Sequence, residues 1–318
     1  MATKKPQTLY HYCSLETFIS IIKNSSLWLS DVKKSNDSKE LIWLRQHYYN
    51  YILNKYHHTE DADIKAICEI ILSLSPQDGL QTCPSWLLPS SGETAKQILE
   101  IFNSFRVYSF CMSQHADSLG QWRGYADAGQ GVAIGFSRKY LEAISGKGLS
   151  CPLFNFMLAD VSYKTDFKSL FDSVFSLHDK TQISEFVLYN LLDITHISAL
   201  FKHPSFKDEK EWRIIYSMSD YDLDKKRLHF EDFDLISSDK YKKNFSKPKI
   251  DYIVNGAKII PHLEVKLNNI TEAINCIVLG PKCNATENDI RHALINFGVL
   301  SDMNDTRIKV IRSESTYQ

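Results

Sequence analysis

The chain has 318 residues, of which 43% are hydrophobic and 24% charged, and these fractions exclude a disordered or fibrous protein. Its 37 lysines and arginines almost cancel its 38 aspartates and glutamates, which excludes binding of a polyanion through net charge alone. The seven cysteines are odd in number and contain no CxxC pair, which argues against a disulfide framework.

Short apolar runs bounded by polar or turn-forming residues predict the strands. In chain order these runs cover residues 9–13, 27–30, 107–113, 132–136, 161–163, 211–216, 252–254, 262–267, 274–279 and 308–311. After the first run, Ser14 is a good helix N-cap and Thr17 occupies the third helical position. A helix is therefore expected from that point to Asn24 or Ser25.

Apolar residues at helical spacing predict the other helices. Two helices are expected between 41 and 75, and others over 94–105, around 140–144, over most of 166–201 and over 287–297, with loops at 76–79 and 84–92. This mixture predicts an α+β fold. We expect a single domain over residues 1–318, with helical insertions at about 41–105 and 166–205.

Polar and aromatic residues crowd the segment between the third and fourth predicted strands. Residues 121–125 are expected to form a loop in which Arg123 could bind a pyrophosphate and Trp122 or Tyr125 could stack on an aromatic ring. An equally weighted alternative is that the aromatic residues plug the edge of the sheet. Gly129-Gln130-Gly131 precedes a strand, whereas a dinucleotide-binding loop precedes a helix, so a hairpin turn is expected there.

His11 lies on the first predicted strand between two tyrosines. One ring nitrogen could bind a ligand hydroxyl while the backbone holds the other, but a histidine hydrogen-bonded at a sheet edge is the preferred reading of this residue alone. Cys13 shares its face and could act as a nucleophile, although no oxyanion loop is evident. The other histidines lack metal-ligand spacing, so no metal is expected.

Glu209 and Glu211 are expected on one face at the entry to a strand, with Arg213 farther along the same side. Two carboxylates beside a cation can keep one carboxylate ionised to stabilise developing positive charge. A charge ladder on an edge strand is the commoner explanation of such a pattern.

The stretch Asp239–Lys249 interleaves lysines with Tyr241 and Phe245. A solvated loop is the favoured interpretation, and a phosphate-binding rim with stacking aromatic residues is the alternative. The first eight residues are polar and no run approaches the roughly 20 apolar residues that span a bilayer. We therefore expect a cytoplasmic protein with reduced cysteines and no membrane partner.

Several motifs together resemble a large bacterial family of unknown function over nearly the whole chain. They are residues 9–14 (LYHYCS), 27–30 (LWLS), 36–37 (ND), 121–127 (QWRGYAD), 131–136 (GVAIGF), 209–213 (EKEWR) and 277–281 (IVLGP). The opening strand, helix and second strand in turn resemble the ADP-ribosyltransferase superfamily, in which these elements form half of the NAD cleft. That resemblance implies a split mixed sheet and NAD as a substrate.

The same resemblance implies roles for individual residues. His11 would hydrogen-bond the adenosine ribose, and the backbone of Tyr12, which replaces a usual glycine, would hold the nicotinamide amide. The other expected NAD-binding residues are Ser30 on the second strand and Trp122, Arg123 and Tyr125 in the aromatic segment. Glu211 would bind the nicotinamide ribose as the catalytic residue, and Glu209 would direct the acceptor.

These roles predict transfer of ADP-ribose from NAD to a macromolecule. An oxocarbenium-like transition state needs a carboxylate near the ribose and a bound nicotinamide leaving group. The resemblance implies a toxin or anti-phage effector acting on RNA, DNA or protein, with an antitoxin as a partner. An NAD glycohydrolase and a non-catalytic nucleotide-sensing domain are the alternatives.

Overall fold

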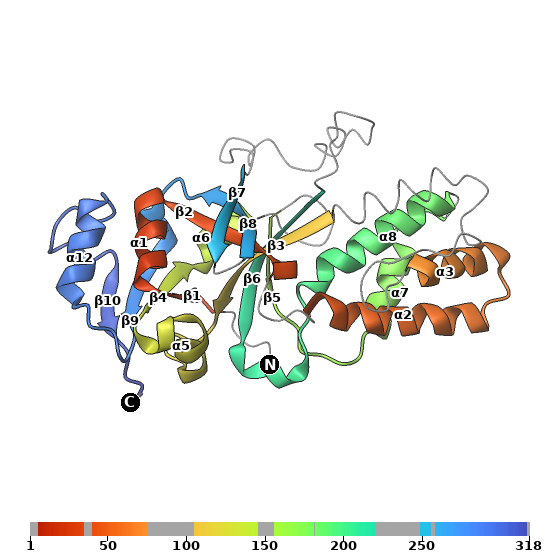
Figure 1. Ribbon diagram of the computed structural model, residues 1–318, viewed down its shortest axis with the longest axis horizontal. Coiled ribbons are helices and arrows are strands. Elements are labelled where there is room, and N and C mark those ends of the chain that lie inside the picture. The colour runs from red at the N-terminus through yellow and green to blue at the C-terminus, as the bar shows by residue number, and fades with distance from the viewer. Residues whose placement is uncertain are drawn as a thin grey trace.

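The computed structural model describes residues 6–34, 40–74, 105–145, 156–180, 182–219, 249–255 and 258–316. These residues form an α+β structure around a ten-stranded mixed sheet, with a group of helices at one end (Figure 1). The strands are β1 (Thr8–Cys13), β2 (Ser26–Asp31), β3 (Phe105–Ser113), β4 (Val132–Ser137), β5 (Met157–Asp160), β6 (Glu211–Ser219), β7 (Lys249–Asn255), β8 (Lys258–Lys266), β9 (Ile274–Leu279) and β10 (Lys309–Arg312). The predicted α+β class is therefore confirmed.

The first three elements follow the local sequence signals. Helix α1 (Leu15–Asn24) begins where the backbone N–H of Thr17 donates to the Ser14 hydroxyl at 3.2 Å. It ends at Ser25, which adopts the left-handed conformation with φ of 47° and so stops the helix. The predicted N-cap, helix and flanking strands are confirmed here.

The sheet splits at β3. Strand β6 pairs with one edge of β3 along its whole length, from Phe105 to Ser113. A strand has only two edges, so β1 and β2 share the other: β1 pairs at Ser113, and β2 pairs at Ser109 and Tyr108. On its other edge β1 pairs with β4, and β2 likewise pairs with β8. The two arms of the sheet therefore part opposite residues 110–112 of β3.

Two hydrophobic cores lie against the sheet. The first packs α1, α6 (Arg138–Ile144), α11 (Ile270–Ala273) and α12 (Glu287–Asn296) against one face of β1, β2, β3, β4, β6, β8, β9 and β10. The second packs α2 (Glu40–His58), α3 (Ala62–Leu74), α7 (Lys168–Ser176) and α8 (Ile183–Ser198) against β3, β5 and β6. The described parts of both predicted helical insertions therefore form this second core together (Figure 1). The helix expected at 94–105, the loops at 76–79 and 84–92, and residues 36–37 and 239–248 lie outside the described residues.

Three local predictions are wrong. Residues 121–125 belong to a helix, α5 (Leu119–Tyr125), which is followed by the 3₁₀ turn η2 (Asp127–Gly129). Gly129 does not close a hairpin, because β1 pairs with both β3 and β4 and thus lies between them. Strand β5 ends at Asp160, and farther on Ser162 forms an isolated bridge with Phe201 in place of the strand expected at 161–163.

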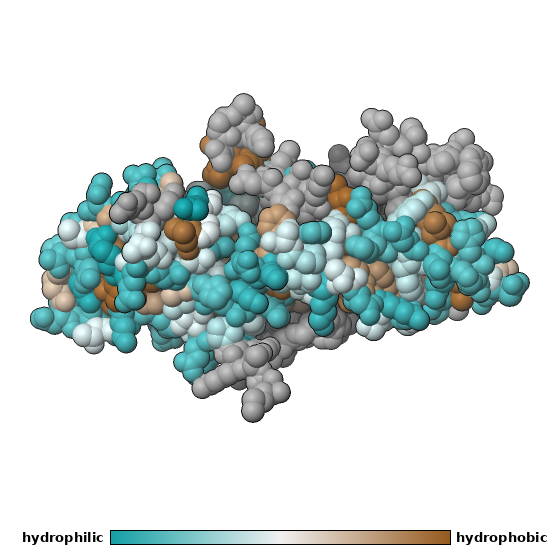
Figure 2. All heavy atoms as spheres, turned by 90° about the horizontal axis from the view of Figure 1, so that it is seen from below, coloured by the Kyte–Doolittle hydropathy of each residue, from teal (hydrophilic) through white to brown (hydrophobic). Residues whose placement is uncertain are grey.

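Viewed from below, polar side chains dominate the surface and hydrophobic ones appear as small separate groups (Figure 2). Among the described residues, no helix has the length and apolar character needed to cross a membrane.

Candidate active site

A polar patch lies on one face of the sheet beside the split. Antiparallel partners point to the same face, and the register pairs Ser30 with Ser109, Cys111 with Arg213, and Ser113 with Glu211. Ser30 and Cys111 are exposed, whereas Glu211 and Arg213 are buried. The patch therefore combines an exposed polar rim with a buried ion pair.

Glu211 and Arg213 form that ion pair. Arg213 Nε donates to Glu211 Oε1 at 2.8 Å and Nη2 donates to Oε2 at 2.9 Å, while Nη1 donates to the Ala199 carbonyl at 2.7 Å. Burial disfavours the charged carboxylate, but the adjacent Arg213 and Lys202 outweigh burial and lower the pKa of Glu211 to about 2. Glu211 is therefore anionic throughout the neutral pH range.

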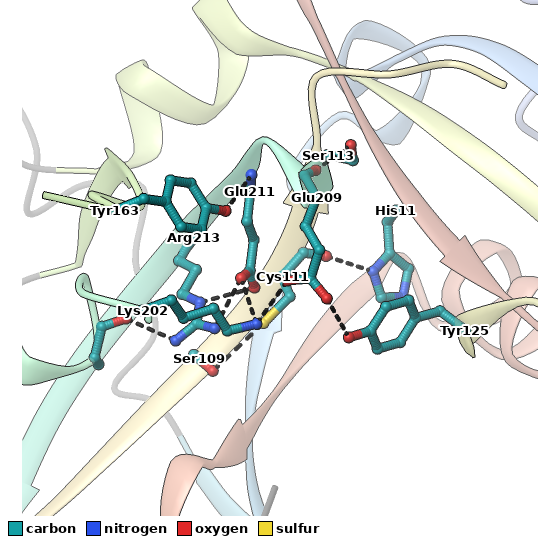
Figure 3. A network of polar contacts seen from close by, with 11 residues as sticks. His11, Ser109, Cys111, Ser113, Tyr125, Tyr163, Lys202, Glu209, Glu211 and Arg213 are labelled. Carbon is teal, nitrogen blue, oxygen red and sulfur yellow. Dashed lines mark hydrogen bonds and ion pairs between the residues drawn. The ribbon is translucent and has the colours of Figure 1, made fainter. Parts of the chain in front are cut away.

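Lys202 joins the two glutamates. Its Nζ lies 2.8 Å from Glu209 Oε2 and 2.9 Å from Glu211 Oε2 (Figure 3). The expected placement of both glutamates on the entry of one strand is wrong: Glu209 ends the 3₁₀ turn η3 (Pro204–Glu209), and Lys210 has a φ of 45° before β6 begins. The carboxylates converge because the chain turns at Lys210, not because side chains alternate along a strand.

Glu209 is the more accessible carboxylate of the two. Its side chain is 20% exposed, against 8% for that of Glu211. Its Oε1 accepts a hydrogen bond from the Tyr125 hydroxyl at 3.1 Å, and Tyr125, at the end of α5, is 49% exposed. Burial and the charge of Glu209 raise the pKa of Tyr125, so this phenol stays protonated and donates.

His11 reaches the site from β1. Its face of the strand is that of Leu9 and Cys13 in the first core, and its ring stacks on Phe110 with centroids 4.2 Å apart. His11 Nδ1 lies 2.8 Å from the Cys111 carbonyl oxygen at the split. Burial lowers its pKa to about 4, so at neutral pH the proton is on Nδ1 and Nε2 can accept.

Cys111 connects His11 to the carboxylates. Its carbonyl accepts from His11, and its thiol hydrogen-bonds the Glu211 carboxylate. Its Sγ also lies 3.7 Å from the Ser109 hydroxyl (Figure 3). Cys111 of β3 therefore contacts both His11 of β1 and Glu211 of β6, two residues that the sequence assigned to the site.

Two of the predicted NAD-binding residues have buried side chains. Trp122 is fully buried and packs edge-on against Tyr12 with ring centroids 4.7 Å apart, and Tyr12 is 4% exposed. Trp122 consequently has no free ring face for a ligand. It packs on one face of the sheet against residues of β1, β4 and β9, and not at the sheet edge as the alternative interpretation expected. Arg123 and Ser30 are exposed, and Tyr125 remains accessible for stacking.

The sequence reasoning missed Lys202, Tyr163 and Cys111. The hydroxyl of Tyr163 accepts from the Glu211 backbone N–H at 3.1 Å. Lys202 precedes Pro204, which starts η3, and that turn was the available signal that the chain folds back toward Glu209. Tyr163 and Cys111 carry no such local signal, because long-range strand packing places them.

The assembled site is chemically suited to stabilising positive charge at its rim. Two carboxylates face two cations, so the buried part is electrically balanced while Glu209 reaches the surface. Tyr125 supplies a flat ring and a hydroxyl, and His11 supplies a neutral acceptor. Within the described ranges, no three His, Cys, Asp or Glu side chains are grouped as metal ligands.

Residues 121–214 match the model of a family described as a protein of unknown function, DUF2971. This range includes α5 from Gln121 onward, Lys202, both glutamates and Arg213, and it confirms the expected resemblance to an uncharacterised family. No curated protein and no solved structure matches the chain.

Proposed function

We propose that this protein cleaves NAD and transfers its ADP-ribose to a macromolecule, within a split sheet of the ADP-ribosyltransferase type. The observation that carries the proposal is the contact network beside the point where the arms of the sheet part at β3. Tyr125, Glu209, Lys202 and Glu211 are joined in this network, and Cys111 links it to His11. The resemblance of the first strand, helix and second strand to that superfamily gives separate support, because it does not depend on the contacts made by Glu209 and Tyr125.

In the proposed reaction, the bond between the nicotinamide nitrogen and C1′ of its ribose breaks, and the electron pair leaves with nicotinamide. An oxygen or nitrogen of the acceptor bonds to C1′ and releases a proton. Positive charge develops on the ribose as the leaving group departs, and a fixed carboxylate beside it lowers the barrier. Cleavage of this bond requires no covalent intermediate with the protein.

The contacts favour Glu209 as the catalytic carboxylate. It is the more exposed of the pair, and Lys202 and Tyr125 hold its two oxygens in place. Both oxygens of Glu211 are engaged by Arg213 and Lys202, so Glu211 acts in this proposal as a positioning residue. The sequence instead predicted Glu211 as the catalytic residue, and the rates of Glu209→Gln and Glu211→Gln separate these assignments.

The neutral His11 fits a hydrogen bond from a ribose hydroxyl to Nε2, because Nδ1 already donates to Cys111. Ser30 offers an exposed hydroxyl on the same face as the carboxylates, and Tyr125 offers a ring for stacking on the nicotinamide. The acceptor class, RNA, DNA or protein, and a toxin or anti-phage role with an antitoxin are proposed from the family resemblance alone.

A second candidate is binding of a nucleotide without turnover. The observation in its favour is the closed ion pair between Glu211 and Arg213, which leaves Glu211 with its charge already compensated.

Incubation of the full chain with NAD labelled in the adenine ring, together with separate RNA, DNA and protein fractions, tests the proposal. Label on one of these macromolecules supports transfer. Free labelled ADP-ribose would instead indicate hydrolysis by water, and NAD that stays intact over a long incubation would contradict both reactions. Glu209→Gln should lose the activity, whereas Glu287→Gln on an exposed position of α12 is the matched control.

A further inference from the structure

Asp117, just before α5, links this helix to the C-terminal segment, residues 313–315. Its Oδ1 accepts from Trp122 Nε1 at 2.5 Å, from the Ser313 hydroxyl at 2.6 Å and from the Ser315 hydroxyl at 2.8 Å. Its Oδ2 accepts from the backbone N–H of Glu314 at 2.8 Å and from that of Ser315 at 3.2 Å. One carboxylate thus holds two parts of the chain that are almost 200 residues apart.

The C-terminal segment approaches Asp117 from a fixed anchor. The backbone N–H of Ser313 donates to the Leu279 carbonyl at 2.8 Å, at the end of β9. Arg312 donates to the carbonyls of Cys283 at 2.9 Å and Ala285 at 2.8 Å. Residues 313–315 therefore lie beside α5 (Figure 1).

The pKa of Asp117 reflects this arrangement. Partial burial opposes ionisation, but hydrogen bonds from Ser313, Trp122 and Ser315 outweigh it and lower the pKa of Asp117 below its usual value. Asp117 is therefore a carboxylate that can only accept, and the donors around it match that requirement.

Helix α5 depends on these contacts for its position. It has seven residues, and a helix this short is not stable by itself. Trp122, in the middle of α5, is fully buried against Tyr12, whose hydroxyl donates to the His115 carbonyl and accepts from the Ser118 N–H. Tyr125, at the end of the same helix, binds Glu209.

We propose that Asp117 is a positioning residue for the active site. By binding the C-terminal segment and Trp122 together, it sets α5 in the position from which Tyr125 contacts Glu209. The effect on catalysis rests on the proposed function, whereas the effect on α5 can be measured without NAD.

Hydrogen exchange of the full chain, followed over residues 119–125, is the first measurement. Asp117→Asn keeps the size of the side chain but replaces one acceptor oxygen with a donor amide. We expect exchange in α5 to rise on the order of tenfold, as for loss of a hydrogen bond to a charged group. Ser313→Ala combined with Ser315→Ala should also raise exchange in α5. Threonine at both positions keeps the two hydroxyls and should restore slow exchange. Ser173→Ala on α7 is the control.

The rate of NAD cleavage is the second measurement. In Asp117→Asn we expect kcat to fall on the order of tenfold. In chains that keep Asp117, kcat should also fall in the double alanine variant of Ser313 and Ser315, and it should stay near the wild-type value in the double threonine variant. Unchanged exchange in residues 119–125, or an equal rise across the whole chain, would overturn the inference whatever the activity. Faster exchange in α5 with unchanged kcat would also overturn it. NAD left intact by the wild-type protein would refute the proposed function. In that case, slow exchange in the double threonine variant would still support the role of Asp117 in positioning α5.

Discussion

Glu211 and Arg213 form a bidentate ion pair two residues apart on β6, closed off from solvent by burial of both side chains. The pair anchors Lys202, and Lys202 in turn holds Glu209 at the surface. The buried half of the site is thus a support for its exposed half.

Glu211→Gln should destabilise the protein, although the substitution is nearly isosteric. The neutral amide leaves the buried Arg213 guanidinium without its counter-charge, and breaking a buried pair in this way costs about 3 kcal/mol or more in the free energy of unfolding. Urea unfolding at pH 7 measures the loss. A double variant, Glu211→Met with Arg213→Met, should lose less than the single one because no buried charge is left unpaired. A single-variant loss below about 1 kcal/mol would contradict this account.

His11 should stay neutral down to a pH of about 4, with its proton on Nδ1. Because the pKa is lower in the folded than in the unfolded chain, the folded protein binds fewer protons between pH 6.5 and 4. The contribution of His11 to the free energy of unfolding is about 3 kcal/mol. It is present above pH 6.5 and is lost as the pH falls from 6.5 to about 4.

Long-range ¹H–¹⁵N NMR spectra of the imidazole, recorded across that pH range, measure both the tautomer and the pKa of His11. His11→Asn should remove this part of the pH dependence of unfolding. A His11 ring that titrates at its usual pKa near 6.5, or that carries its proton on Nε2, would refute the assignment.

Tyr125→Phe should slow NAD cleavage with little effect on stability. The variant keeps the ring for stacking but loses the hydrogen bond to Glu209, which is worth about 1 kcal/mol and corresponds to roughly a fivefold lower kcat. Steady-state kinetics on both proteins measure the change. Tyr252→Phe, on an exposed tyrosine of β7, is the control and should leave kcat unaltered.

Two glycines near the site should respond to alanine in opposite directions. A Cβ at Gly131 would lie 2.1 Å from the Cys13 carbonyl oxygen, so Gly131→Ala should cost about 1–3 kcal/mol through displaced backbone. A Cβ at Gly124 in α5 would meet nothing within 4 Å, so Gly124→Ala should stabilise by about 0.5–1 kcal/mol. Thermal unfolding of both variants tests the pair, and a gain at Gly131 would show that the turn after α5 is not packed as described.

The parts of the fold set by neighbouring residues could be predicted from sequence. The Ser14 cap requires only the adjacent helix, and the shared face of Glu211 and Arg213 follows from strand alternation. The α+β class and the helical insertions also follow from periodicity, because their apolar stripes extend over several turns.

The wrong predictions depend on contacts distant in sequence. The glycine turn looked like a hairpin because nothing between β3 and β4 signals that β1 inserts there. Helix α5 spans about two turns, which is too short for a periodic pattern, and Trp122 is buried only because the sheet covers it. Lys202 joins the site because η3 folds back; Pro204 signals this turn in the sequence, but nothing in the sequence signals that Lys202 contacts both glutamates.

Both transfer and hydrolysis must release nicotinamide from NAD, so the rate of its release measures cleavage whatever the acceptor. We expect steady release by the wild-type chain and a rate lowered on the order of 10²–10³-fold in Glu209→Gln, as when a group that stabilises the transition state is removed. Glu211→Gln, measured where it remains folded, should be affected less. Absence of nicotinamide release from the wild-type chain would contradict NAD cleavage by this protein, and equal release by Glu209→Gln would contradict the catalytic role of Glu209.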